Sequence, residues 1–290
     1  MSIVPNQDKR IELKYLLDER LAQDVKAWAR ERLGCDPHCC ESLVDSYDVH
    51  TLYLDTPTWD LYHRTGVVGS TKHRVRQYSH EKTNSHEQTL WLECKRKKKN
   101  VVHKNRTAVP ALEAADRLCG QPSLDHSNWC GDWFVQRIAD RCLRPAVQVH
   151  YRRFARMSTL EGENLRLTID SHLQASQVSG WDDSLVRHCS NGDLRQNVSP
   201  VQILELKFHN QMPWLFKELL RKFAIPASGF SKYRSAVDGC QLLETTEQLA
   251  GDQPSPPLSQ SSSEHKFGLT ANTAGEIARA YRLEGRLSDA

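Results

Sequence analysis

Charged side chains recur at every second position in several strand-like segments of this chain. An apolar or small residue separates most of the pairs, which are Glu12/Lys14, Arg74/Arg76, Glu93/Lys95, Lys104/Arg106 (around Asn105), Arg166/Asp170 (around Thr168) and Glu205/Lys207. Because successive side chains of a strand point to opposite faces, both members of a pair share one face. On a single strand this pattern is typical of a solvated face. Its repetition on five or six strands predicts a sheet closed on itself, with a polar interior and an apolar outside.

Segments rich in Val, Ile, Leu, Thr, Tyr and Trp, with polar residues interleaved, predict eight strands. They are Lys9–Leu16, His50–Asp55, Lys72–Tyr78, Thr89–Lys97, Val101–Val109, Val147–Met157, Asn164–Ala175 and Val201–His209. Helices are predicted after the N-cap Asp18 as far as Leu33, from Pro110, over Trp129–Leu143 and from Pro213. The polar stretch Gln177–Pro200 predicts a long loop. The expected fold is α+β, a closed antiparallel β-barrel that forms a tunnel with a charged lumen and is covered by helices.

The composition, 39% hydrophobic and 26% charged, is that of an ordinary globular protein. No apolar run is long enough to cross a bilayer, and the N-terminus lacks the apolar stretch of a signal peptide. The nine cysteines have no framework spacing, which is typical of a reducing compartment. These features predict a cytoplasmic protein with no transmembrane segment of its own. Residues 1–243 are predicted to form the tunnel domain, and the Pro/Ser/Gln-rich residues 244–290 a disordered tail.

The predicted lumen contains more cations than carboxylates. Clustered cations in a medium of low dielectric constant repel one another, so such a site requires an anion. Arginine guanidinium groups match phosphate oxygens in bidentate fashion, and lysines act as point charges. The carboxylates can hold a hard divalent ion, Mg²⁺ or Mn²⁺, that bridges to phosphate oxygens. The residues therefore predict a tunnel for a polyphosphate and a divalent metal.

Two other interpretations of charged or metal-binding segments are weaker. The run Asp36-Pro-His38-Cys39-Cys40 contains zinc-type ligands, but it lacks a second pair of cysteines at ligand spacing. The basic run 95–99, near Trp91 and Tyr78, is similar to a nucleic-acid patch. The acids Glu93 and Glu205 would repel a nucleic-acid backbone, so no nucleic-acid partner is predicted.

In these segments the sequence resembles the VTC domain family, the polyphosphate polymerase branch of the triphosphate tunnel metalloenzymes. The resemblance extends over about Lys9–Val237 and preserves the order of the motifs. These are ELKY (Glu12–Tyr15), LYLDTPTWDLYHR (Leu52–Arg64), KHRVRQY (Lys72–Tyr78), LWLECKRK (Leu90–Lys97), KNR (Lys104–Arg106), HYRRFAR (His150–Arg156), LRLTID (Leu165–Asp170), ILELKF (Ile203–Phe208) and GFSKY (Gly229–Tyr233).

The resemblance implies a β-barrel tunnel in which the γ-phosphate of ATP is transferred to a growing polyphosphate chain with Mn²⁺ or Mg²⁺. The catalytic cations it implies in this numbering are Lys14, Arg74, Arg76, Lys95, Arg153, Arg166, Lys207 and Lys232. Lys104, Arg106 and Ser231 are expected to bind phosphate as well. Glu205 is the principal metal ligand expected, with Glu93 and Asp170 as further ligands. ATP and polyphosphate are the expected partners.

One departure from the superfamily pattern bears on the reaction. The related CYTH triphosphatases begin with a Glu-x-Glu-x-Lys motif, and Arg10 stands here in place of the first Glu. The loss of that carboxylate favours the polymerase over a CYTH-type triphosphatase or adenylate cyclase. Two alternatives remain open. One is a tunnel triphosphatase that hydrolyses tripolyphosphate or nucleoside triphosphates. The other is a non-catalytic polyphosphate-binding module that primes or scaffolds a partner, such as a membrane protein.

Overall fold

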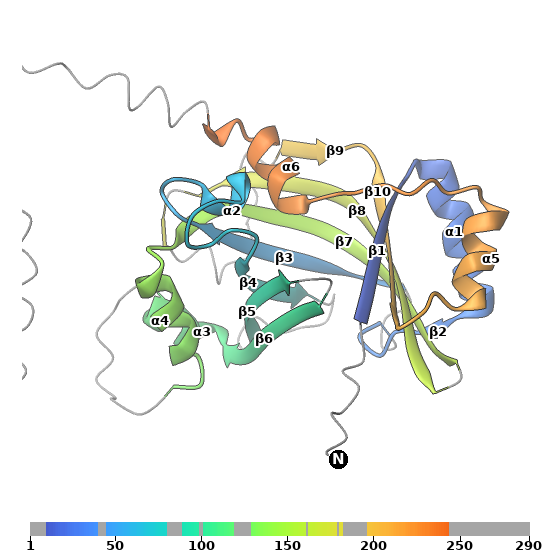
Figure 1. Ribbon diagram of the computed structural model, residues 1–290, viewed down its shortest axis with the longest axis horizontal. Coiled ribbons are helices and arrows are strands. Elements are labelled where there is room, and N and C mark those ends of the chain that lie inside the picture. Colours follow the sequence, from blue (N-terminus) through green and yellow to red (C-terminus); the bar gives the residue numbers. More distant parts are fainter. Residues whose placement is uncertain are drawn as a thin grey trace, which may run out of the picture. The chain divides into compact units, whose positions relative to one another are not determined.

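The computed structural model describes residues 10–39, 45–79, 89–98, 101–118, 129–160, 162–178, 180–181 and 196–243. These residues form one antiparallel sheet (Figure 1). Its main path runs β1 (Arg10–Leu17), β10 (Gln202–His209), β8 (Glu163–Gln177), β7 (Arg144–Leu160), β3 (Ser46–Asp55), β4 (Lys72–Ser79), β5 (Thr89–Lys98) and β6 (Val101–Pro110). The predicted tail, residues 244–290, lies outside the described residues, so the predicted division of the chain stays a prediction.

The eight predicted strands are all present; β4, β5 and β6 extend one residue further than predicted, and β3, β7 and β8 are longer by at least three residues. β3 begins at Ser46, and β7 and β8 together form a long hairpin that ends at Gln177. Two short strands were not predicted, β2 (Gly34–Cys35) beside β7 and β9 (Gln196–Ser199) beside β8. β9 lies within the stretch expected to be a loop. Its four residues QNVS carry little apolar pattern, so only pairing with β8 identifies them as a strand.

The prediction of a closed barrel is wrong for the described residues, because the path of the sheet ends at β1 and β6, which do not pair. Another segment occupies the outer edge of β1 instead. Leu16 N donates a hydrogen bond to Ser228 Oγ (3.0 Å), and Lys14 forms an isolated bridge with Ser228. A side-chain contact nevertheless joins β1 to β5, since Lys95 Nζ lies 2.9 Å from Glu12 Oε2. The strongly curved sheet therefore encloses a charged concave face without a continuous ladder of hydrogen bonds.

The predicted helices are present with adjusted ends. The predicted N-cap Asp18 accepts a hydrogen bond from Leu21 N (2.8 Å) at the start of α1 (Glu19–Arg32). Pro110 is the last residue of β6, directly before α3 (Ala111–Leu118), and Pro213 is the N-cap of α5 (Trp214–Lys222). The helix expected over Trp129–Leu143 is α4 (Asp132–Asp140). α2 (Asp60–His63) and α6 (Lys232–Gly239) were not predicted.

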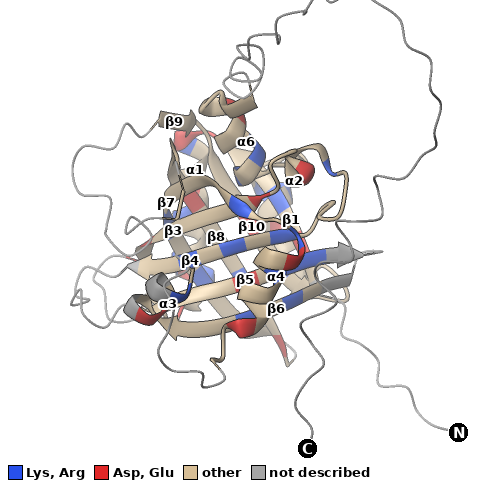
Figure 2. Ribbon diagram, turned by 90° about the vertical axis from the view of Figure 1, so that its left-hand side faces the viewer, with Lys and Arg blue, Asp and Glu red and all other residues tan. Residues whose placement is uncertain are grey.

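Two apolar clusters stabilise the sheet. α1 and α5 lie side by side in Figure 1 and pack through Val25, Trp28 and Phe216 into a cluster with Leu167 and Leu206. The second cluster contains the central strands and residues of α3, α4 and α6. Figure 2 shows Lys and Arg recurring on neighbouring strands of the same sheet. Within the described ranges, no helix is both long enough and apolar enough to cross a lipid bilayer.

A buried carboxylate, Asp55, fixes the turn that follows β3 against α6. Its oxygens accept hydrogen bonds from Leu61 N (2.8 Å), Tyr62 N (3.2 Å) and the hydroxyl of Tyr233. Within the turn, Gly66 has φ +57° and approaches Asp60 so closely that a Cβ atom would lie 2.0 Å from its Oδ2. Only glycine fits there. The turn and the start of α6 are therefore held together at one end of the concave face.

Candidate functional site

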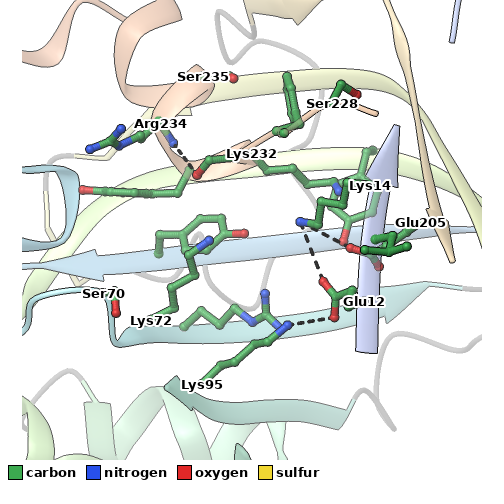
Figure 3. A pocket seen from close by; sticks show the side chains of 18 of the residues that line it. Glu12, Lys14, Ser70, Lys72, Lys95, Glu205, Ser228, Lys232, Arg234 and Ser235 are labelled. Carbon is green, nitrogen blue, oxygen red and sulfur yellow. Dashed lines mark hydrogen bonds and ion pairs between the residues drawn. The ribbon is translucent and has the colours of Figure 1, made fainter. Parts of the chain in front are cut away.

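A cavity of about 1230 Å³ lies on the concave face of the sheet (Figure 3). Residues of β1, β3, β4, β5, β7 and β10 line it, and the segment 227–235, which includes the first turn of α6, lines another side. Ten of the lining residues are Lys or Arg and two, Glu12 and Glu205, are acidic. The cavity therefore has a large excess of positive charge.

The strand register explains why these charges meet. Lys14 pairs with Glu205 and Glu12 with Lys207 across β1 and β10, and Arg74 pairs with Glu93 across β4 and β5. Paired residues of neighbouring strands share a face. The alternation of charged and apolar residues thus places the charges on the concave face, and Val75 and Leu206 in the apolar clusters.

Four cations surround the Glu93 carboxylate, which is fully buried. Arg74 Nη2 lies 2.7 Å and Arg76 Nη1 3.7 Å from Oε2, whereas Lys104 Nζ and Arg106 Nε lie 2.8 Å and 3.1 Å from Oε1. Burial alone would raise the pKa of Glu93, but Arg74, Arg76 and Lys104 outweigh it and hold that pKa well below its ordinary value. Glu93 therefore fixes the orientation of four cations predicted to bind phosphate.

Asp170 likewise forms ion pairs with two other predicted cations. Arg153 binds it in bidentate fashion, with Nε 2.6 Å from Oδ1 and Nη2 2.8 Å from Oδ2, and Lys232 Nζ lies 2.6 Å from Oδ2. Burial would raise the pKa of Asp170, but the charges of Arg153 and Lys232 lower it to about 2. Since Lys232 is the first residue of α6, this pair also fixes the start of that helix to β7 and β8.

Glu205 and Glu12 form the only pair of carboxylates among the residues lining this cavity. Lys14 Nζ lies between them, 3.3 Å from Glu205 Oε1 and 3.8 Å from Glu12 Oε1, and Lys207 Nζ lies 2.6 Å from Glu205 Oε2 (Figure 3). Burial would raise the pKa of Glu205, but Lys207, Lys14 and Lys232 hold it well below its ordinary value. For Lys207, burial outweighs the attraction of Glu205 and lowers the pKa to about 8.

The three carboxylates predicted to bind metal do not meet as one ligand set. Within the described part of the chain, no group of three or more His, Cys, Asp and Glu residues could hold a metal ion. The carboxylates of Glu93 and Asp170 each form ion pairs with two or more cations. Glu205, in contrast, lies beside Glu12, with Lys14 Nζ between the two carboxylates. Magnesium commonly takes one or two carboxylates and completes its coordination with phosphate oxygens. The Glu12–Glu205 pair fits a divalent ion of this kind, with Lys14 Nζ in the position of a cation.

Two further predicted site residues differ in their surroundings. Ser231 lines the cavity and is the N-cap of α6, where its Oγ accepts a hydrogen bond from Arg234 N (3.4 Å). Arg166 does not line this cavity, and its guanidinium binds Asp36 (2.8 Å) and the hydroxyl of Tyr47 (3.0 Å). Asp36 thus neutralises Arg166. For the possible zinc site in the run 36–40, the described residues contain no cluster of three or more metal ligands. Cys40, the last residue of that run, lies outside the described residues.

Several lining residues were not predicted, notably Lys72, Arg64, Arg234, Tyr53 and Tyr151. Lys72 precedes Arg74 by two positions, so the period that identified Arg74 and Arg76 extends to it. Arg64 follows α2, and Arg234 lies on α6, so no strand period could indicate them. Burial would raise the pKa of Tyr53, but Arg74, Lys72 and Arg76 lower it to about 7.

Acid is expected to destabilise the protein through Asp170 and Glu93. Both carboxylates have lower pKa values in the folded protein than in an unfolded chain, so protonation favours unfolding. Their contribution is complete above about pH 5 and is lost as the pH falls towards 2. For Asp170, the change from 3.8 to about 2 corresponds to roughly 2 kcal/mol. Urea unfolding at pH 7, 5, 4 and 3 would measure it. Asp170→Asn should flatten the pH profile, and an equally steep profile in this variant would contradict the assignment.

Comparisons with known proteins give one family and two distant structures. A family model described as the VTC domain matches residues 9–240. A crystal structure from Bacillus halodurans, described as that of a candidate adenylate cyclase, has a TM-score of 0.41 and 13% identity, and covers 77% of this chain and 95% of its own. The PH1819 protein from Pyrococcus horikoshii has a TM-score of 0.40 and 11% identity, and covers 81% and 99%. No curated protein matches this sequence significantly.

Proposed function

This chain belongs to the VTC domain family, whose model covers most of it, and we propose that it is a polyphosphate polymerase. In this proposal, the cavity binds ATP and a polyphosphate chain, and the γ-phosphate of ATP is transferred to the end of the chain. One observation supports it above all. A cavity of about 1230 Å³ is lined by ten Lys and Arg residues against two Glu residues. A chain of phosphates is a ligand that can neutralise such a row of cations.

The chain's own residues position the reacting groups. Phosphoryl transfer requires mainly in-line orientation and neutralisation of charge, and little covalent chemistry. Arg74, Arg76 and Arg153 are already oriented by Glu93 and Asp170, so little reorganisation is needed when phosphate binds. The terminal phosphate of the polyphosphate, ionised at neutral pH, is the nucleophile. It attacks the γ-phosphorus of ATP as the bond to the β,γ-bridging oxygen breaks and ADP leaves. The reaction therefore needs no general base.

The Glu12–Glu205 pair is proposed to hold the divalent ion. When bound, Mn²⁺ or Mg²⁺ would neutralise charge on the phosphate oxygens of the nucleotide. Lys14 would then leave its position between the two carboxylates and contact a phosphate oxygen. Lys207 remains beside Glu205 and keeps that carboxylate ionised.

The test is an elongation assay with purified protein, ATP, Mn²⁺ and a short polyphosphate primer. Products are resolved on a gel stained for polyphosphate, and Arg74→Ala serves as a variant that lacks one cation of the cavity. A ladder of longer chains that is lost in the variant is the expected result. Free phosphate without a ladder would instead indicate a tunnel triphosphatase. Primer binding without turnover would indicate a polyphosphate-binding module, and would contradict the proposed reaction.

A further inference from the structure

Lys72 is a cavity residue to which no role has been assigned. It is the first residue of β4, two positions before Arg74, and therefore shares the concave face with Arg74 and Arg76. Figure 3 shows its side chain directed into the cavity, on the side of Ser70 and away from the Glu12–Glu205 pair. This part of the cavity also contains Arg234, whose guanidinium donates hydrogen bonds to the carbonyl oxygen of Tyr62 (2.6 Å from Nη2).

The surroundings of Lys72 distinguish it from the other lysines of the cavity. Lys14, Lys95, Lys207 and Lys232 each have a carboxylate oxygen within 3.3 Å. Among the described residues, Lys72 has no such partner. The groups that influence it are Lys14 of β1, Tyr53 of β3, Arg74 of β4 and Lys95 of β5, and Lys95 is its direct register partner.

This arrangement is unfavourable without a ligand. Burial opposes the charged form of Lys72, and the nearby Lys14, Arg74 and Lys95 add repulsion. Both effects lower its pKa to about 8, although Tyr53 acts in the opposite direction. Lys14, by contrast, exchanges a carboxylate for a phosphate when a polyanion binds. Lys72 gives up no such contact, so its interaction with phosphate adds directly to the binding free energy.

We propose that Lys72 is a further phosphate-binding residue, and that it binds the polyanion at the side of the cavity away from the Glu12–Glu205 pair. The inference rests on the proposed function, since it takes a chain of phosphates to be the ligand. It adds Lys72, to which the resemblance assigned no role, to the predicted phosphate-binding residues. The carboxylate pair and Lys72 would then contact different phosphates of the same ligand.

Isothermal titration calorimetry with tripolyphosphate, without nucleotide or metal, tests the inference at pH 7. Lys72→Met is expected to weaken binding about 10- to 100-fold, the range for a contact with a charged group. Lys72→Arg keeps the charge and should bind within about threefold of the unchanged protein. Lys217→Met, on the exposed side of α5, is the matched control and should have no effect. Thermal unfolding of each variant establishes that it is folded.

The same titration at pH 9.5 provides a second measurement that does not depend on Lys72→Met. There, a neutral Lys72 must take up a proton before it can bind phosphate, whereas an arginine stays charged. Other cavity groups, such as Lys207, titrate in both proteins, so the comparison isolates position 72. The unchanged protein should therefore lose more affinity than Lys72→Arg between pH 7 and 9.5.

The outcomes separate this inference from the proposed function. Tight tripolyphosphate binding by the unchanged protein, with equal affinity in Lys72→Met, would overturn the role of Lys72 alone. Equal losses of affinity between pH 7 and 9.5 in the unchanged protein and in Lys72→Arg would overturn it as well. Absence of tripolyphosphate binding by the unchanged protein would overturn the proposed function, and with it this inference.

Discussion

Replacing Glu205 by Gln is expected to lower the rate of polyphosphate elongation by about 100-fold or more. The amide keeps the size of the side chain but removes one of the two carboxylates that adjoin Lys14. A metal ion contributes several kcal/mol of transition-state charge stabilisation, and about 3 kcal/mol corresponds to roughly 100-fold in rate. The measurement is the initial rate of elongation over a titration of Mn²⁺, with ATP and primer in excess.

Glu93→Gln is the matched control, because Glu93 is also a buried carboxylate beside cations of the concave face. If Glu93 only orients those cations, the substitution should lower the rate without changing the Mn²⁺ concentration that gives half of the maximum. Glu205→Gln should raise that concentration. An identical Mn²⁺ dependence in the Glu205 variant and the unchanged protein would contradict a ligand role for Glu205.

Replacing Arg153 by Met is expected to destabilise the fold by about 3–5 kcal/mol, the usual cost of removing one partner of a buried ion pair. Arg153 is buried and makes two short contacts with Asp170, whose carboxylate is completely inaccessible to solvent. Among the described residues, the substitution leaves Lys232 as the only cation within salt-bridge distance of Asp170. Urea unfolding at pH 7 measures the loss as a lower midpoint with an unchanged slope.

Arg152→Met is the control for the second prediction, since the neighbouring side chain points to the opposite face of β7. Arg152 is half-buried, and its Nε donates a hydrogen bond to Ser46 Oγ (3.0 Å). Its replacement should cost about 1 kcal/mol. Combining Arg153→Met with Asp170→Asn should recover part of the stability, because the uncompensated charge is then removed. Similar losses for the two arginines would refute the role of the Arg153–Asp170 pair.

Much of the sheet could be predicted because the pattern that indicates each strand lies within a short stretch of sequence. A period of two fixes which face each residue of a strand occupies, so Lys14, Arg74 and Glu205 could be assigned to one face without knowledge of strand order. The same reasoning could have included Lys72. The apolar stripe of α1 and its Asp18 cap are equally local signals.

What could not be predicted depends on contacts between distant segments. The outer edge of β1 contacts the segment around Ser228, more than 200 residues later, and does not pair with β6. Glu93 and Asp170 were expected beside a metal, but their neighbouring cations come from several strands and from α6. The strand period gives the face of a residue and not its partners. The strand period therefore indicated the excess of positive charge in the cavity. The ion pairs within the cavity could be identified only from the structure.

The pairing of β1 with β10 has a consequence for the way this protein folds. These strands are the first and the last of the sheet in the sequence, and their register joins Glu12 to Lys207 and Lys14 to Glu205. Contacts between residues so far apart form only after a large loss of chain entropy, which slows folding. During synthesis, β1 can pair with β10 only after β10 has left the ribosome. The Glu12–Glu205 pair therefore cannot form until nearly the whole of the sheet has been synthesised.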